Sequence, residues 1–177
     1  MRIIAGTHKG QRIVAPRGTR TRPTSDRVRE NVFNLVAPWV EDADVLDLYA
    51  GSGAMGMEAL SRGASRATLV ESDVQACRAI NENLDRLRLS GATVLCQNVT
   101  HYLAAETRTY DLVFCDPPYD DYARVERDLA RHVPRLMAPD GLLVLETSSR
   151  APAPELPTLS PRTTRRYGAA RITLFEP

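Results

Sequence analysis

Four residues, Asp116-Pro117-Pro118-Tyr119, directly follow an apolar run that ends at Cys115. Two prolines after a buried strand remove backbone donors and end the hydrogen-bonded ladder, so they are a poor choice for structure alone. They supply a rigid turn with free carbonyl groups. The Asp116 carboxylate and the Pro117 carbonyl can accept hydrogen bonds from the exocyclic amino group of a base, and Tyr119 can stack on that base. The tetrapeptide therefore indicates chemistry on a ring amino group, whose lone pair must be turned toward an electrophile.

A glycine loop upstream has the composition of a cofactor-binding turn. Residues 45–56 read as an apolar strand, a G-x-G-x-x-G turn and a helix start. This pattern also occurs in nicotinamide dinucleotide sites. Asp47 lies four residues before Gly51, where a carboxylate suits the ammonium of an aminoacyl ligand and serves no need of a pyrophosphate. No other segment offers hydride-transfer chemistry. The spacing of Asp47, Gly51 and Gly53 resembles the cofactor loop of Rossmann-like methyltransferases.

Two further polar residues follow expected strands. Glu71 comes about twenty residues after Gly51, where a carboxylate can accept both hydroxyls of a ribose. Asn98 follows Cys96 by two residues and can either approach an adenine or cap the helix that begins at Val99. Glu71, like the carboxylate of the glycine loop, has the alternative role of capping a neighbouring helix. The pattern supports a nucleoside ligand.

From residue 44 onward, apolar strands alternate with helical patterns, which predicts a mostly parallel sheet with helices on both faces. The expected strands are Asp44–Tyr49, Ala67–Glu71, Thr93–Cys96, Tyr110–Cys115 and Gly141–Thr147, followed by an antiparallel hairpin of Arg162–Tyr167 and Ala170–Phe175. The expected helices are Thr24 to about Ala37, Ala54–Arg62, Val74–Leu89, about Val99–Ala105, and Tyr122 to about Val133. In a seven-stranded α/β sheet of this kind, the glycine loop and the tetrapeptide meet at the carboxyl edge of the strands.

The first 29 residues are strongly basic. They hold eight basic residues and one acid, a net charge of +7, whereas the remaining residues carry a net charge of −6. Two short strand candidates, Arg2–Ala5 and Gln11–Ala15, predict a small N-terminal β-hairpin. Such charge asymmetry favours a polyanionic partner, although a solvated basic tail has the same composition.

Bulk features exclude several classes of protein. No apolar run approaches the roughly 20 residues needed to span a bilayer. The residues after Met1 lack the apolar region of a secretory signal. The three cysteines, Cys77, Cys96 and Cys115, match neither a disulfide framework nor a zinc pattern. We expect a cytoplasmic protein with no metal site and no membrane contact.

The tetrapeptide resembles the motif of amino methyltransferases that act on adenine N6, cytosine N4, guanine N2 or protein glutamine. The front of the chain narrows this set. Its segments Arg2-Ile3-Ile4-Ala5-Gly6, Lys9-Gly10, residues 22–30 and Phe33-Asn34 resemble the RsmD family. The match covers nearly the whole chain, and the run Arg-Pro-Thr-Ser-Asp-Arg-Val-Arg-Glu is specific. The Pro-rich loop 151–161 has no clear counterpart in that family.

The resemblance implies a Rossmann-like class I methyltransferase domain over residues 24–177 and a basic RNA-docking arm over residues 1–23. It implies S-adenosyl-L-methionine as cofactor and a guanine N2 of 16S ribosomal RNA, on assembling small subunits, as acceptor. We expect a monomer. The expected catalytic residues are Asp116, Pro117, Pro118 and Tyr119. The expected cofactor contacts are Asp47, Tyr49, Gly51, Ser52, Gly53, Glu71, Ser72, Asn98, Val99 and Asp116. The expected RNA contacts are Arg2, Lys9, Arg12, Arg17, Arg20, Arg22, Arg27 and Arg29.

Three alternatives remain open at the level of sequence. A DNA adenine-N6 or cytosine-N4 methyltransferase would use the same tetrapeptide, but usually adds a target-recognition region for which no segment here is long enough. A protein-glutamine methyltransferase would leave the basic arm unexplained. A non-catalytic RNA-binding assembly factor would not need an intact set of motif residues. Arg27 and Arg29 also have two interpretations, since they can reach the mouth of the site or pair with Glu30 and its neighbours.

Overall fold

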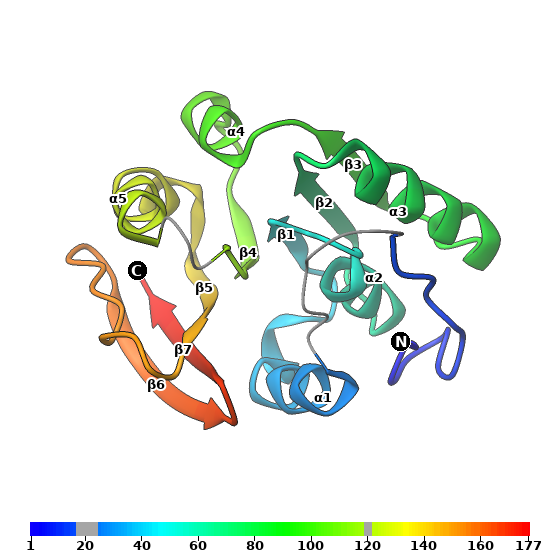
Figure 1. The fold of residues 1–177 in the computed structure, drawn as a ribbon, viewed down its shortest axis with the longest axis horizontal. Coiled ribbons are helices and arrows are strands. Elements are labelled where there is room, and N and C mark those ends of the chain that lie inside the picture. The colour runs from blue at the N-terminus through cyan, green and yellow to red at the C-terminus, as the bar shows by residue number, and fades with distance from the viewer. Residues whose placement is uncertain (17–24, 119–121) are drawn as a thin grey trace.

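The computed structural model describes residues 1–16, 25–118 and 122–177. Its centre is a seven-stranded sheet in the order β3-β2-β1-β4-β5-β7-β6 (Figure 1). The parallel strands are β1 (Asp44–Leu48), β2 (Arg66–Glu71), β3 (Ala92–Cys96), β4 (Tyr110–Cys115) and β5 (Met137–Ser148). Strands β6 (Ser160–Tyr167) and β7 (Ala170–Glu176) form an antiparallel hairpin that pairs with β5 through β7. The predicted fold class is confirmed.

Strand β5 begins four residues earlier than the sequence predicts. The strand runs through Pro139 and Asp140, with a register shift between the pairs Tyr110↔Met137 and Leu112↔Leu142. Gly141 sits at this irregularity, where a Cβ would lie 3.0 Å from the Tyr110 carbonyl oxygen. A glycine is therefore required for the backbones to approach this closely.

Helices cover both faces of the sheet. Helices α1 (Asp26–Leu35), α2 (Ala54–Ser61) and α3 (Val74–Leu87) pack on one face, and α4 (Val99–Ala105) and α5 (Tyr122–His132) pack on the other (Figure 1). Short 3₁₀ turns follow α1 at Ala37–Trp39 and α5 at Val133–Leu136. Helix α1 ends two residues before the predicted Ala37 because Pro38 disfavours helical geometry in the residue before it.

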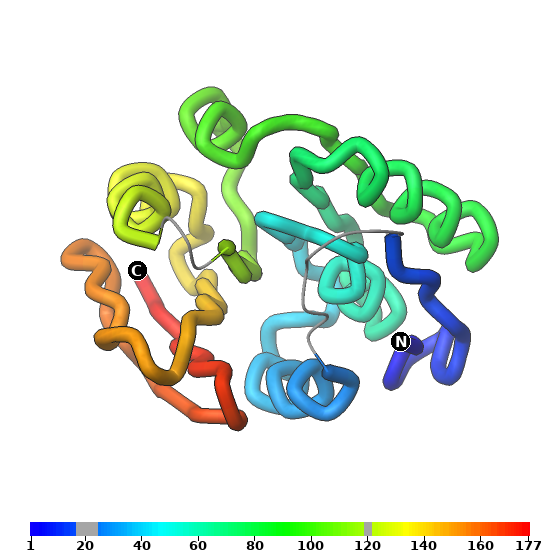
Figure 2. Tube along the Cα trace, in the orientation of Figure 1, coloured from blue at the N-terminus to red at the C-terminus, as the bar shows by residue number. Residues whose placement is uncertain are grey.

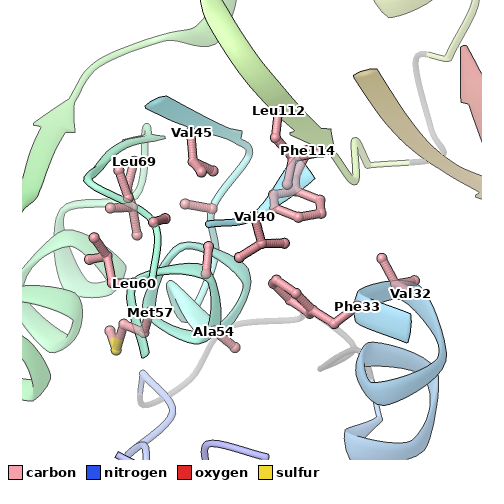
Figure 3. Close-up of a cluster of buried hydrophobic side chains, with 14 of the residues drawn as sticks. Val32, Phe33, Val40, Val45, Ala54, Met57, Leu60, Leu69, Leu112 and Phe114 are labelled. Carbon is pink, nitrogen blue, oxygen red and sulfur yellow. The ribbon is translucent and has the colours of Figure 1, made fainter. Parts of the chain in front are cut away.

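The α1 face holds a continuous apolar core. Phe33 of α1 packs against Phe114 of β4 with ring centroids 5.4 Å apart, and Figure 3 shows Val40 beside both rings and Leu112 beside Phe114. The Arg62 guanidinium lies 4.8 Å from the centroid of the Phe33 ring. This packing fixes α1 against the centre of the sheet, next to the strand that carries the tetrapeptide.

Residues 1–16 are part of this core. They form a hairpin with one ladder bridge, Arg2↔Arg12, which lies beside α2 in Figure 2. Ile3 and Ile13 are fully buried. The backbone N–H groups of Ile4 and Ala5 donate to the Glu58 carboxylate of α2 at 2.8 and 3.0 Å. The boundary at residue 23 stays a prediction, but the hairpin is not detachable, since removing it would strip a buried carboxylate of two donors.

The Pro-rich loop 151–159 is held by Arg171 of β7, whose buried guanidinium donates to the carbonyls of Ser149, Ala151 and Pro152. Leu156 and Leu159 of this loop are buried in the core on the α5 face. The loop therefore covers part of the α5 face of the sheet. Within the described residues, no helix is long and apolar enough to cross a membrane.

Candidate functional site

Three carboxylates gather at the carboxyl edge of the parallel strands. Asp47 lies near the end of β1, Glu71 ends β2, and Asp116 directly follows β4, which is the other neighbour of β1. Both Asp116 and Glu71 lie close enough to raise the pKa of Asp47. A concentration of negative charge at this edge favours a cationic ligand and opposes a pyrophosphate.

Asp47 is the most buried of the three carboxylates, with 3% of its surface exposed. One of its oxygens accepts a hydrogen bond from the Gly56 N–H of α2 at 3.0 Å. Burial raises its pKa to about 8, the Gly56 bond opposes this shift, and the charges of Asp116 and Glu71 add to it. The raised pKa favours the protonated form of Asp47 in the absence of a cation, and an approaching cation favours the ionised form.

Glu71 ties the glycine loop to the end of β2. Its Oε2 accepts from the Gly51 N–H at 2.8 Å, and its Oε1 accepts from the N–H groups of Ser72 and Asp73 at 2.7 and 2.8 Å. A carboxylate offers about four acceptor positions, so these bonds leave little free capacity. For Glu71 to accept both ribose hydroxyls, as the sequence suggested, at least one of these bonds must be exchanged.

The glycine loop turns through left-handed backbone at Tyr49, Gly51 and Gly53, with φ values of 59°, 54° and 73°. A Cβ on Gly51 would have the Tyr49 carbonyl oxygen at 3.9 Å as its nearest neighbour. A Cβ on Gly53 would instead meet Ile80, Met57 and Leu69 at 3.0 to 3.1 Å. Of the two glycines, Gly51 faces open space on the loop, whereas Gly53 permits packing against the core. Ser52 donates through its hydroxyl to the Met1 sulfur at 3.3 Å, which brings the N-terminus to the loop.

Asn98 caps α4. Its side-chain oxygen accepts from the Thr100 N–H at 2.8 Å, which agrees with the second of its two interpretations. The Val99 side chain is buried in the core on the α5 face, so only its backbone is available to a ligand at this edge. Ser72 is exposed beside Glu71. Contact of these residues with a cofactor stays a prediction.

The tetrapeptide leaves the sheet at the same edge. Asp116 is half-buried, Pro117 is buried and Pro118 is exposed. The pairing Cys115↔Leu145 puts Asp116 next to Glu146 of β5. The expected stacking residue Tyr119 lies outside the described residues. Two hydrogen-bond acceptors, the Asp116 carboxylate and the Pro117 carbonyl, thus stand beside the acidic cluster of Asp47 and Glu71.

The expected RNA contacts differ in their placement. Arg2, Lys9, Arg12 and Arg27 are exposed. Lys9 lies away from the acidic cluster, because the neighbouring residues Thr7 and His8 bond to the last residues of α2 and α3 at the opposite edge of the sheet. Arg17, Arg20 and Arg22 lie outside the described residues.

Arg29 does not fit the expected role in RNA contact. Its side chain has no exposed surface, and it forms ion pairs with Asp26 at 3.0 Å and with Glu58 at 3.5 Å. It also donates to the Arg2 carbonyl. Arg29 lies on the inner side of α1, two residues from the exposed Arg27, so it links α1, α2 and the hairpin. We therefore remove Arg29 from the expected RNA contacts.

Sequence reasoning missed Glu58, which organises this junction. The carboxylate accepts from Ile4, Ala5 and Arg62 and faces Arg29, and it is fully buried. One signal was available in the sequence, since Glu58 is the only polar residue within residues 54–60 of this helix. Sequence reasoning also missed the exposed Arg150, Arg165 and Arg166 at the β6–β7 hairpin.

The raised pKa of Asp47 gives a testable pH dependence. A cationic ligand pairs with the ionised carboxylate, so the affinity for S-adenosylhomocysteine should rise by up to about tenfold per pH unit below pH 8 and then level off. Isothermal titration calorimetry between pH 6 and 8 would measure this affinity. Near pH 6, binding should release a proton from the Asp47 carboxyl. The variant Asp47→Asn should bind weakly at every pH. A wild-type affinity that does not change with pH would contradict this role.

The same shift makes a prediction for stability. Because the folded-state pKa of about 8 exceeds the usual 3.8, the stabilising effect of the Asp47 carboxyl is complete below pH 4 and is lost as the pH rises toward 8. The variant Asp47→Asn should therefore melt at a higher temperature than the wild type at pH 8, without ligand.

Comparison with known proteins places the chain among related sequences. The model of the family described as Conserved hypothetical protein 95 matches residues 1–176. The chain is 44% identical, over 67% of its length, to Ribosomal RNA small subunit methyltransferase D of Escherichia coli, and this match covers 60% of that relative. It is 34% identical to the Putative rRNA methyltransferase YlbH of Bacillus subtilis, over 88% of the chain and 86% of the relative.

Solved structures agree with the sequence relatives. The fold superimposes on the putative methyltransferase yhhF from Escherichia coli with a TM-score of 0.87, at 32% identity, over 99% of this chain and 96% of that one. A hypothetical protein from Thermus thermophilus gives a TM-score of 0.85 at 32% identity, over 100% of this chain and 99% of that one.

Proposed function

The chain belongs to the RsmD family, and from this premise we propose that it transfers a methyl group from S-adenosylmethionine to the exocyclic N2 of a guanine in 16S ribosomal RNA. One observation carries the proposal. The acidic cluster of Asp47 and Glu71 suits a ligand with an ammonium and a sulfonium, and it lies beside two hydrogen-bond acceptors, the Asp116 carboxylate and the Pro117 carbonyl. A dinucleotide would bring a pyrophosphate into this negative field.

The donor, when bound, supplies an electrophilic methyl group. The chain's own residues would hold the donor and position the acceptor. Asp47 would pair with the aminoacyl ammonium, and Glu71 would bind the ribose. The Asp116 carboxylate and the Pro117 carbonyl would accept the two hydrogens of the guanine amino group, so that its lone pair is aimed at the methyl carbon. Transfer forms the N–C bond, breaks the S–C bond and releases one amino proton. Positioning of this kind can supply much of the rate.

We propose that RNA phosphates contact Arg2, Lys9, Arg12 and Arg27, together with Arg17, Arg20 and Arg22. We further propose that the chain acts as a cytoplasmic monomer on small subunits during assembly. The relatives named ribosomal RNA methyltransferases support an RNA substrate. The hairpin is tied to α2 through Glu58, so point substitutions test these contacts better than truncation does.

Transfer of a tritiated methyl group tests the proposal. The full chain would be incubated with small ribosomal subunits from cells that lack its gene, with 16S RNA extracted from them, and with DNA, and each product would be digested to nucleosides. We expect N2-methylguanosine from the subunits or the RNA. Label in N6-methyladenine or N4-methylcytosine of DNA would establish the DNA alternative. RNA binding without any transfer would establish the non-catalytic assembly factor.

A further inference from the structure

The β6–β7 hairpin carries a group of exposed arginines at the same edge of the sheet as the Asp116-Pro117-Pro118 turn, which is called the catalytic turn below because of its proposed role. Strand β7 runs antiparallel to β5 with Ser148 opposite Ala170, so the turn between β6 and β7 stands at the carboxyl end of β5. Ser149 fixes this turn, with its N–H donating to the Ala169 carbonyl at 2.8 Å and its hydroxyl to the Gly168 carbonyl at 3.0 Å. Arg150 follows Ser149, and Arg165 and Arg166 lie just before the turn.

These arginines have no acidic partner among the described residues. The Arg165 guanidinium donates only to the carbonyl of Thr164, and within the same described part of the chain the guanidinium groups of Arg150 and Arg166 make no hydrogen bond or ion pair. Arg162, on the same strand but near its other end, is fully engaged. It pairs with Glu176, and its guanidinium lies 5.0 Å from the centroid of the Trp39 ring. On β6, positive charge is therefore left uncompensated at the end that lies near the catalytic turn.

Protection of the sheet edge does not account for this charge. Lysines and arginines on an edge strand prevent pairing with other chains, but β3, the opposite edge, has the sequence Ala-Thr-Val-Leu-Cys and carries no charge. An acidic protein partner also fits poorly, because protein interfaces have an apolar centre. The large hydrophobic residues exposed on the described surface are Val14 and Val74, which lie on the hairpin of residues 1–16 and on α3.

We propose that Arg150, Arg165 and Arg166 bind phosphates of the substrate RNA on the side of the catalytic turn opposite to the N-terminal hairpin. In the sheet order, β4 has β1, β2 and their covering helices on one side and β5, β7 and β6 on the other. The hairpin of residues 1–16 docks on α2 and α3. Arg165 pairs with Ile172, whose side chain is in the core on the α1 face, whereas Arg166 pairs with Arg171 on the α5 face. Guanidinium groups on both faces of the sheet can thus bind phosphates of one RNA strand that crosses this edge.

The experiment compares the triple variant R150Q/R165Q/R166Q with the charge-matched control R88Q/R127Q/R131Q, whose arginines are exposed at the end of α3 and on α5. Filter binding of 16S RNA, without methyl donor, would be measured from about 50 to 400 mM salt. Loss of three phosphate contacts should reduce the slope of log affinity against log salt by about 2. The affinity at about 150 mM salt should fall about tenfold or more, and the control should change by less than about threefold.

Three results would overturn the inference. The first is an equal salt slope for the two variants, and the second is unchanged RNA binding together with self-association of R150Q/R165Q/R166Q in sedimentation. The third is weaker binding of R150Q/R165Q/R166Q to assembled subunits but not to naked RNA, which would indicate a protein partner. Absence of RNA binding by the wild type would overturn it as well. The inference rests on the proposed RNA substrate but not on catalysis. A wild type that binds RNA and transfers no methyl group would refute the proposed function alone, and equal melting temperatures would confirm that both variants fold.

Discussion

Replacing Asp116 with alanine should reduce the single-turnover rate of methyl transfer by about 10² to 10³-fold, the loss typical when one preorganised hydrogen-bonding group is removed from an active site. The carboxylate would act on the acceptor amine, so the loss should appear in the chemical step at saturating RNA. The affinity for S-adenosylhomocysteine should be kept or should increase at pH 7. The reason is that the charge of Asp116 raises the pKa of Asp47, and its removal favours the ionised form of Asp47.

The measurement combines rapid-quench single turnover with calorimetry on the same preparations. The variant Asp116→Asn separates charge from shape, because its amide retains one acceptor and adds two donors that would face the amine. It should be nearly as slow as alanine. Substitution of the exposed Asp85 on α3 serves as a control for loss of one negative charge. An Asp116→Ala rate within a few-fold of the wild type would exclude the proposed orienting role.

Much of the site could be predicted because it depends on local sequence and on one rule of topology. Apolar runs separated by helical patterns determine the parallel order, and the carboxyl ends of neighbouring parallel strands meet at one edge. Asp47, Glu71 and Asp116 could therefore be placed together without any knowledge of their contacts. The start of β5 was predicted less accurately. The strand begins before the predicted Gly141 and contains Pro139, although proline seldom lies inside a strand.

Other parts of the site were beyond local reasoning, since they depend on which face a side chain occupies after packing. The sequence placed Gly53 among the expected cofactor contacts, but a side chain there would point at Ile80 and Leu69 in the core. The arginines of the β6–β7 hairpin gain their position from the pairing of β7 with β5, which joins segments with no sequence signal in common. The net charge of the whole chain is only +1, so the total gives no indication of this local positive charge.

Arg29 shows the same limit and makes the second large prediction. Arg27 and Arg29 read alike in a basic segment, yet Arg27 is exposed and Arg29 is fully buried against Glu58 and Asp26. Removing one partner of a buried ion pair leaves an uncompensated charge and typically costs about 3–5 kcal/mol. Because Arg62 remains bonded to Glu58 at 2.7 Å, we expect Arg29→Met to lower the free energy of unfolding by about 3 kcal/mol. For a chain of this size this lowers the melting temperature by about 6 to 12 °C.

The matched variant Arg27→Met should melt within about 1 °C of the wild type, since surface substitutions have small effects, and should instead weaken RNA binding. Adding Glu58→Gln to Arg29→Met should recover part of the lost stability, because the buried charge is then removed together with its partner. Thermal melts by circular dichroism and filter binding of 16S RNA would be measured on all four chains. If Arg29→Met melted like the wild type and lost as much RNA affinity as Arg27→Met, Arg29 would belong to the RNA surface, and the junction of α1, α2 and the hairpin would not depend on it.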